Sequence, residues 1–118
     1  METEARMRGI LEEQRAWFNG GHTLPVAARL EALERLERAI LRHEQDLYRA
    51  LKADLGKSQM EAYMCEVGLT LSELRYVRKH TRVWSRDRRV LTPLAQFPAK
   101  SFTVQEPYGV VLILSPWN

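Results

Sequence analysis

The sequence lacks most of the features that mark secreted, disulfide-bonded or membrane-spanning proteins. It has a single cysteine, Cys65, in 118 residues, which excludes an internal disulfide and fits a reducing compartment. The N-terminus is charged and has no apolar core behind it, so no secretory signal is visible. The longest apolar run, Val110–Leu114, is far shorter than the about 20 residues of a membrane helix. We therefore expect a cytoplasmic location and no membrane segment in this part of the chain.

Metal sites and a strong charge of one sign are also missing. His22, His43 and His80 are too scattered for zinc, whose ligands repeat at short spacings. The formal net charge is only +3, from 18 Lys and Arg against 15 Asp and Glu. The total therefore does not imply a tail that binds nucleic acid.

Three long helices are predicted from apolar residues that recur at steps of three and four. The first ends at 19–21, Asn-Gly-Gly, and the second runs from Pro25 to a stop at Gly56, with a possible bend near 43–45. The third begins at the capping box 58–61 and runs to about Ser85. Its inner stripe is predicted to comprise Met60, Tyr63, Met64, Val67, Leu71, Leu74, Val77 and Trp84.

Two strands are expected after an extended crossing. Residues 86–99 contain two prolines and few apolar residues, which disfavours a helix. Ser101–Glu106 alternates with period two, as a half-exposed strand does. Val110–Leu114 is apolar throughout, which is typical of a strand buried on both faces of a parallel sheet. Because such a strand needs neighbours and covering helices, we expect these residues to be the N-terminal part of a larger α/β protein.

Two local patterns imitate catalytic sites. Gly56-Lys57-Ser58 resembles the end of a phosphate-binding loop, but Leu51 stands where that loop needs a glycine. A glycine that ends one helix, followed by a serine that caps the next, accounts for this tripeptide better. Cys65 lies inside the third predicted helix without a histidine nearby in sequence, so we predict a structural or semi-exposed thiol and not a nucleophile.

A basic run supports a different class of function. Seven cations, relieved only by Asp87, lie between residues 75 and 89: Arg75, Arg78, Lys79, Arg82, Arg86, Arg88 and Arg89. They would suit a non-enzymatic helical module that binds an acidic partner through Arg75–Arg89. The simpler interpretation is a solvated helix end and loop, favoured by the helix dipole.

The last residue, Asn118, has two interpretations that the residues alone leave open. Asparagine is among the best N-caps, so Asn118 could begin a further helix. It also follows a predicted central strand, and ligands bind beyond the carboxyl ends of such strands. There its side-chain amide could donate to an oxygen that becomes negative during acyl chemistry.

The chain resembles aldehyde dehydrogenases, and their class 3 branch in particular. Residues 106–118, EPYGVVLILSPWN, are similar to the family's "EPxGVVxxxxPWN" stretch. Residues 30–36, LEALERL, and 50–57, ALKADLGK, are similar to the N-terminal helices of class 3, as are residues 61–63 and 66–67. The resemblance spans nearly the whole chain in one register.

This resemblance implies NAD(P)-dependent oxidation of an aldehyde to a carboxylate, through a cysteine thiohemiacetal and thioester. It implies that Asn118 holds the oxyanion and that Leu114, Ser115, Pro116 and Trp117 line the cofactor cleft. The full chain would be a homodimer, with 1–85 and 109–118 in the cofactor-binding domain and an oligomerisation-type strand within 86–108. The family's nucleophile, general base and glycine-rich cofactor turn match nothing in these residues, and Cys65 does not match the nucleophile. The isolated 118 residues are therefore expected to be inactive, or to interfere with assembly of complete subunits.

Overall fold

The computed structural model of the protein describes residues 2–115, and for Glu2 the backbone alone. The chain forms two compact units. One is Val26–Ser85, and the other combines Met1–Pro25 with Arg86–Asn118. Each unit has its own architecture.

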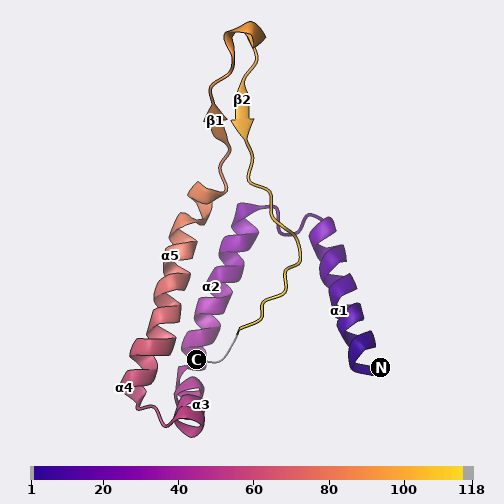
Figure 1. Ribbon diagram of the computed structural model, residues 1–118. Helices are drawn as coiled ribbons and strands as arrows, with labels where there is room; N and C mark the ends of the chain where they lie inside the picture. Colours follow the sequence, from indigo (N-terminus) through magenta and orange to yellow (C-terminus); the bar gives the residue numbers. More distant parts are fainter. Residues whose placement is uncertain (1, 116–118) are drawn as a thin grey trace. The chain divides into compact units, whose positions relative to one another are not determined.

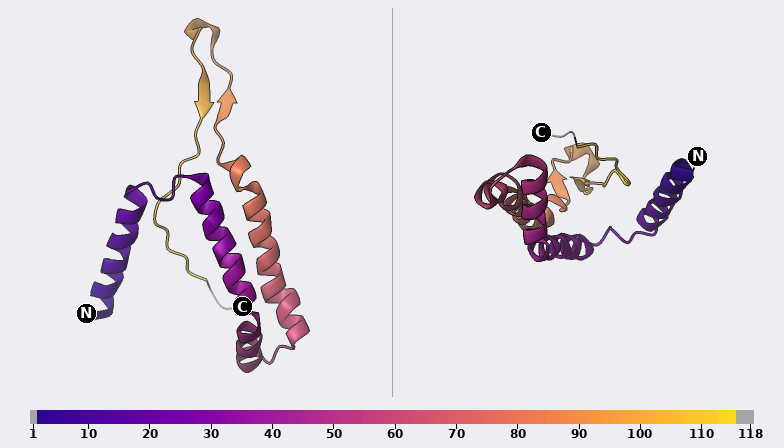
Figure 2. Two further views of the ribbon diagram at one scale, coloured as in Figure 1. Left: turned by 180° about the vertical axis from the view of Figure 1, so that it is seen from behind. Right: turned by 90° about the horizontal axis from the view of Figure 1, so that it is seen from below.

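The Val26–Ser85 unit is a helical hairpin. It begins with α2 (Val26–Arg42) and α3 (Glu44–Leu55). A third helix then runs back, as α4 (Gln59–Ala62), the π-helical turn η1 (Tyr63–Val67) and α5 (Gly68–Trp84). Both ribbon views show α2 and α5 side by side (Figures 1 and 2), and the two helices pack against each other.

Short-range signals in the sequence fix the ends of these helices. The predicted bend is the break at His43, between α2 and α3. The predicted stop is confirmed at Gly56, whose φ of 69° is left-handed and whose N–H donates to the carbonyl of Lys52. The predicted N-cap is confirmed at Ser58, whose hydroxyl accepts a 3.2 Å hydrogen bond from the N–H of Glu61.

The π-helical turn η1 was not predicted. One extra residue in this turn rotates the helix faces that precede it relative to those of α5. Gly68 follows the turn at a point where space is tight: a Cβ on it would lie 2.7 Å from the carbonyl oxygen of Tyr63 and 3.1 Å from its ring. Glycine is therefore the residue that lets α5 continue directly from the turn.

A small core holds this unit together. Tyr48, Ala62, Val67 and Leu71 are buried in one cluster, and Ile40 and Leu51 pack against it. Half of the inner stripe predicted for the third helix was wrong, and the extra residue of η1, which changes the phase of the pattern, accounts for the wrong positions up to residue 64. Four of the eight predicted positions are exposed: Met60, Tyr63, Met64 and Trp84.

The other unit contains α1 (Glu2–Asn19) and a β-hairpin. As predicted, the helix ends at Asn19, and Gly21 beyond it has a φ of 75°. In the hairpin, β1 (Arg88–Val90) pairs antiparallel with β2 (Ser101–Thr103). The predicted strand within Ser101–Glu106 is thus confirmed over its first three residues.

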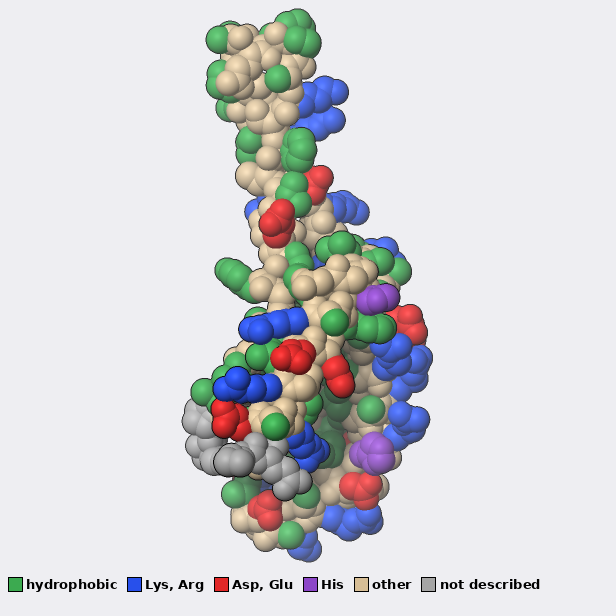
Figure 3. Space-filling model, turned by 90° about the vertical axis from the view of Figure 1, so that its right-hand side faces the viewer, with side chains coloured by type: hydrophobic (Ala, Val, Ile, Leu, Met, Phe, Trp, Pro, Cys, Tyr) green, Lys and Arg blue, Asp and Glu red, His purple; other side chains and the backbone are tan. Residues whose placement is uncertain are grey.

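The loop of the hairpin exposes large apolar side chains. It contains a short 3-10 turn, η2 (Leu94–Gln96). Leu91, Leu94 and Phe97 are nearly fully accessible. Green hydrophobic side chains accordingly gather at the end of the hairpin in the space-filling view (Figure 3).

The buried strand predicted for Val110–Leu114, as the first strand of 109–118, is not formed among the described residues, and it stays a prediction for the complete protein. Residues 111–115 form no regular element, and Leu112 is 82% exposed. The physical reason is that a strand exists through its pairing, and no described segment hydrogen-bonds to this one. The observed composition, helices followed by two strands, agrees with the predicted class, with β1 in place of the terminal strand.

Membrane-spanning helices are absent from the described part of the chain, since none of its helices combines the necessary length with enough apolar residues.

Candidate functional site

The segment that precedes Asn118 lies along a shallow groove in its own unit. Gly109 has a φ of 96°, a conformation that favours glycine, and turns the chain toward Phe18 of α1. The groove has a volume of about 450 Å³. Its lining is mainly apolar and comprises Glu13, Gln14, Trp17, Phe18, Thr23, Gly109, Val110 and Val111.

The predicted site residues lie at and beyond the end of this groove. Leu114 and Ser115 are exposed and do not line it. Pro116, Trp117 and Asn118 lie outside the described residues. The structure therefore describes two of the five predicted positions.

The backbone of residues 111–115 is available to other groups. Within the described residues it makes no hydrogen bond. Exposed N–H and C=O groups in an extended segment can pair with a neighbouring strand or bind a ligand. This property fits one wall of a dinucleotide cleft, although the described residues do not form the cleft by themselves.

Cys65 does not have the surroundings of a nucleophile. Its thiol is free and exposed within η1, and the hydrogen bonds and ring contacts described for the three histidines do not involve it. The nearby ammonium of Lys57 is held by Glu66, with Nζ and Oε1 2.5 Å apart. This hydrogen bond is the main reason that the pKa of Lys57 is raised.

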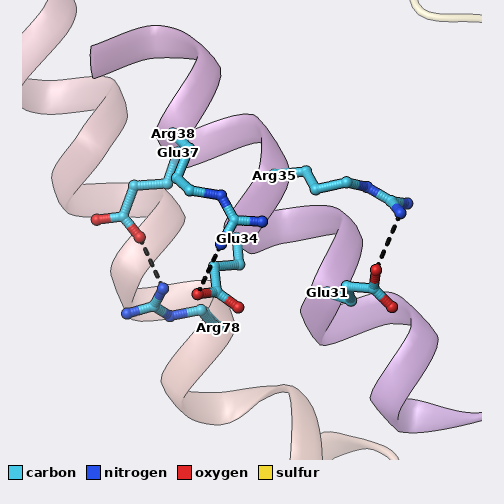
Figure 4. Close-up of polar contacts among 6 residues, drawn as sticks. All are labelled: Glu31, Glu34, Arg35, Glu37, Arg38 and Arg78. Atoms are coloured by element: carbon cyan, nitrogen blue, oxygen red, sulfur yellow. Dashed lines mark hydrogen bonds and ion pairs between the residues drawn. The ribbon is translucent and has the colours of Figure 1, made fainter. Parts of the chain in front are cut away.

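The basic run is partly neutralised by one carboxylate of α2. Glu37 is almost buried, and each of its oxygens accepts one guanidinium: Oε1 lies 2.6 Å from Nε of Arg75, and Oε2 lies 2.7 Å from Nη1 of Arg78. Figure 4 shows the Arg78 contact between α5 and α2. The hydrogen bond from Arg75 is the largest cause of a lowered pKa at Glu37, opposed by burial and aided by the charge of Arg78. Two of the seven cations are thus used to join helices.

Each of the three histidines has its own local partner. His22 stacks on Trp17 with ring centroids 4.0 Å apart, and His43 hydrogen-bonds Asp46. His80 packs against the rings of both Tyr76 and Trp84. Among residues 2–115, no three His, Cys, Asp or Glu side chains gather in a way that could hold a metal ion.

Sequence reasoning missed the two tertiary features of α5. The Glu37–Arg75 contact joins positions 38 apart, and no local pattern signals it. The ring stack of Tyr76, His80 and Trp84 has the spacing i, i+4, i+8, which could have been found in the sequence. It was missed because Trp84 was assigned to the buried stripe.

Comparison with known proteins gives one consistent family. The sequence profile of the aldehyde dehydrogenase family matches residues 2–118. The chain is 42% identical over 106 residues to the 4,4'-diaponeurosporen-aldehyde dehydrogenase of Staphylococcus aureus, covering 90% of this chain and 23% of that protein. It is 40% identical over 115 residues to the dimeric NADP-preferring aldehyde dehydrogenase of dog, covering 97% of this chain and 25% of that protein.

Class 3 members and a solved structure agree with this result. Human aldehyde dehydrogenase family 3 member B1 is 36% identical over 108 residues, which cover 92% of this chain and 23% of that protein. The substrate-bound structure of Staphylococcus aureus AldH aligns with a TM-score of 0.82 and 38% identity, over 86% of this chain and 22% of that chain. The chain therefore spans about a quarter of the length of the relatives that it matches.

Proposed function

Because the chain belongs to the aldehyde dehydrogenase family, we propose that it is the N-terminal part of a class 3-like, NAD(P)-dependent enzyme that oxidises an aldehyde to a carboxylate. The observation that carries this proposal is the family match over residues 2–118. The names of the matched relatives, which include a 4,4'-diaponeurosporen-aldehyde dehydrogenase, support an aldehyde as the substrate class.

In this proposal Asn118 is the oxyanion donor. Its side-chain amide would donate a hydrogen bond to the aldehyde oxygen as that oxygen gains negative charge. Such a donor accelerates acyl chemistry because it is oriented before the reaction begins. The cysteine nucleophile would lie outside these 118 residues, since Cys65 lacks the required surroundings.

Leu114, Ser115, Pro116 and Trp117 would hold the cofactor. The free backbone groups of Leu114 and Ser115 support this role, because they can hydrogen-bond a ligand at the end of an extended segment. NAD or NADP, when bound, accepts a hydride from the substrate carbon. The name of the dog relative indicates NADP for that protein, and we leave the choice between NAD and NADP to experiment.

We also propose a cytoplasmic homodimer for the complete protein. Within residues 2–115, the hairpin of β1 and β2 has a free outer edge on each strand, and free edges favour pairing with another chain. The dog relative is named as dimeric, which supports the same assembly. In this proposal residues 86–108 belong to the oligomerisation region, while 1–85 and 109–118 belong to the cofactor-binding domain.

The test is an assay of the complete protein that contains these residues. Aldehyde-dependent formation of NADH or NADPH is expected, and it should disappear when the downstream cysteine nucleophile is changed to alanine. The same assay on the isolated 118 residues should show no turnover. Turnover by the isolated chain that is lost in Cys65→Ala would contradict the proposal.

Binding of an acidic partner through Arg75–Arg89 receives no support from the described geometry, since Glu37 occupies Arg75 and Arg78. Heparin binding provides the test of this alternative. A salt-dependent affinity of the chain for heparin would support it if that affinity is lost when the charges of Arg86, Arg88 and Arg89 are reversed.

A further inference from the structure

A groove lies between α3 and the third helix of the Val26–Ser85 unit, and we call it the α3 groove. Its volume is about 380 Å³, which falls in the range of sites that hold small molecules. Its lining comprises Ile40, Leu47, Ala50, Leu51, Asp54, Glu66, Val67 and Thr70. Because five of these eight side chains are apolar, the groove suits the hydrocarbon part of a ligand.

Two helix faces form the walls of the α3 groove. Leu47, Leu51 and Asp54 recur at steps of four and three along α3, so their side chains share one face of that helix. Glu66 and Thr70 lie opposite, four positions apart where η1 joins α5. Figure 1 shows α3 beside the start of the third helix, and the two segments pack together. The groove therefore belongs to the fold of this unit alone.

The floor of the α3 groove is part of the core. Val67 is buried in the core cluster, and Ile40 and Leu51 pack against that cluster. Ala50, the smallest of the lining side chains, is exposed beside them. A ligand would thus cover side chains that are already held in place by packing, so little ordering entropy would be lost when it binds.

The charged groups that line the α3 groove are both carboxylates. Glu66 is neutralised by Lys57, whereas Asp54 is exposed and belongs to none of the ion pairs formed among residues 2–115. Asp54 also lies in the last turn of α3, where the negative end of the helix dipole adds to its field. Lys52, the cation of that turn, does not line the groove.

We propose that the α3 groove binds an amphipathic amine, that is, a hydrocarbon chain with one terminal ammonium group. The chain would lie over Ile40, Leu51 and Val67, and the ammonium would lie beside the carboxylate of Asp54. An anion of the same length would be repelled by that carboxylate, because charges interact more strongly beside an apolar wall than in open water. The site requires neither a cofactor nor turnover, so it goes beyond the proposed function and can be tested without it.

Methyl NMR of the complete protein tests the site with n-octylammonium as the probe. Saturable shifts are expected for the methyl groups of Leu51 and Val67, which line the groove. Octanoate, which has a chain of the same length and the opposite charge, should bind at least about fivefold more weakly. Absence of saturable shifts at these methyl groups, or equal affinities for the two probes, would overturn the proposal.

A pair of matched variants tests the role of the carboxylate. Asp54→Asn should weaken the binding of n-octylammonium by about threefold, as expected for a partly exposed ion pair, and should leave the binding of octan-1-ol unchanged. Asp46→Asn makes the same change on the same helix, at a residue that pairs with Arg49 and does not line the groove. It should leave both affinities unchanged. Equal weakening by the two variants would overturn the proposal.

A variant that fills the α3 groove tests its location. Ala50→Trp places a large ring at the exposed edge of the lining and should abolish the shifts caused by n-octylammonium. Because Ala50 is exposed, the unfolding midpoint should change by less than about 2 °C. Binding by a folded Ala50→Trp protein with the affinity of the original would place the amine elsewhere and overturn the proposal. If this variant does not fold, the comparison of Asp54→Asn with Asp46→Asn decides.

Discussion

Nε of Arg75 lies 2.6 Å from Oε1 of Glu37, and this contact joins α5 to α2 across 38 positions of the chain. Arg78 occupies the second oxygen of the same carboxylate. An almost buried carboxylate that accepts two guanidinium groups fixes the register of two helices, because a shift of either helix would leave a charge without its partner.

The Glu37 contact predicts a dependence of stability on acid pH. The pKa of Glu37 is lowered in the folded state, so its contribution is complete above the usual value of 4.5 and is lost as pH falls through the folded value. Glu37→Gln should therefore destabilise the chain at neutral pH and flatten the acid limb of its stability curve. Urea unfolding at several pH values measures both. Glu34→Gln, in an exposed pair on the same helix, is the control and should leave the acid limb unchanged.

A second prediction concerns the close approach at Gly68. Gly68→Ala places a Cβ 2.7 Å from the carbonyl oxygen of Tyr63 and should destabilise the protein by about 1–3 kcal/mol. Gly9→Ala in α1 meets no atom within 4 Å and should stabilise it by about 0.5–1 kcal/mol. Denaturant unfolding of both variants provides the comparison. Stabilisation by both changes would mean that η1 has no steric limit at position 68.

A third prediction concerns the ionisation of Tyr48. Its hydroxyl donates to Glu44, and this bond, with burial, raises the pKa of Tyr48 to about 12. The neutral phenol is thus favoured by folding, so its stabilisation is present below the unfolded value of 10 and lost as pH rises through the folded one. Ultraviolet titration should show one tyrosine that ionises at a higher pH than the others, and this late ionisation should be absent from Tyr48→Phe. Tyr108→Phe, which removes a fully exposed phenol, is the control and should leave this late ionisation unchanged.

The fourth prediction concerns catalysis by the complete enzyme. Asn118→Ala should slow acylation by about a hundredfold or more if the amide stabilises the oxyanion. The acylation burst and steady-state rate measure this effect. Cys65→Ser is the control and should leave both rates unchanged. An unaltered burst in Asn118→Ala would mean that Asn118 serves as a helix cap.

Short-range signals predicted the helices of this chain well. The stop at Gly56 and the cap at Ser58 depend on residues within four positions, so the sequence contains all that determines them. The buried strand at Val110–Leu114 could not be confirmed in the same way, because a strand depends on neighbours that local residues do not supply. Trp84 was misassigned because Thr81 takes the buried position in the last turns of α5, while Trp84 packs on His80.

In the candidate site, too, some features are signalled by neighbouring residues and others are visible only in the structure. The resemblance of residues 106–118 named Asn118 and its neighbours, while the Glu37–Arg75 contact emerged only from the packing of α2 and α5. The comparisons confirmed the family, and the roles of Leu114–Asn118 stay predictions.

The π-helical turn η1 also bears on how this chain tolerates insertion and deletion. A helix of regular pitch that loses a residue rotates everything beyond the loss by about 100°. Tyr63–Val67 already holds one residue more than such a helix needs, so removing one there would restore ordinary pitch and leave the buried face of α5 against α2. The third helix thus has one place where its length can change in evolution while α5 keeps its buried face.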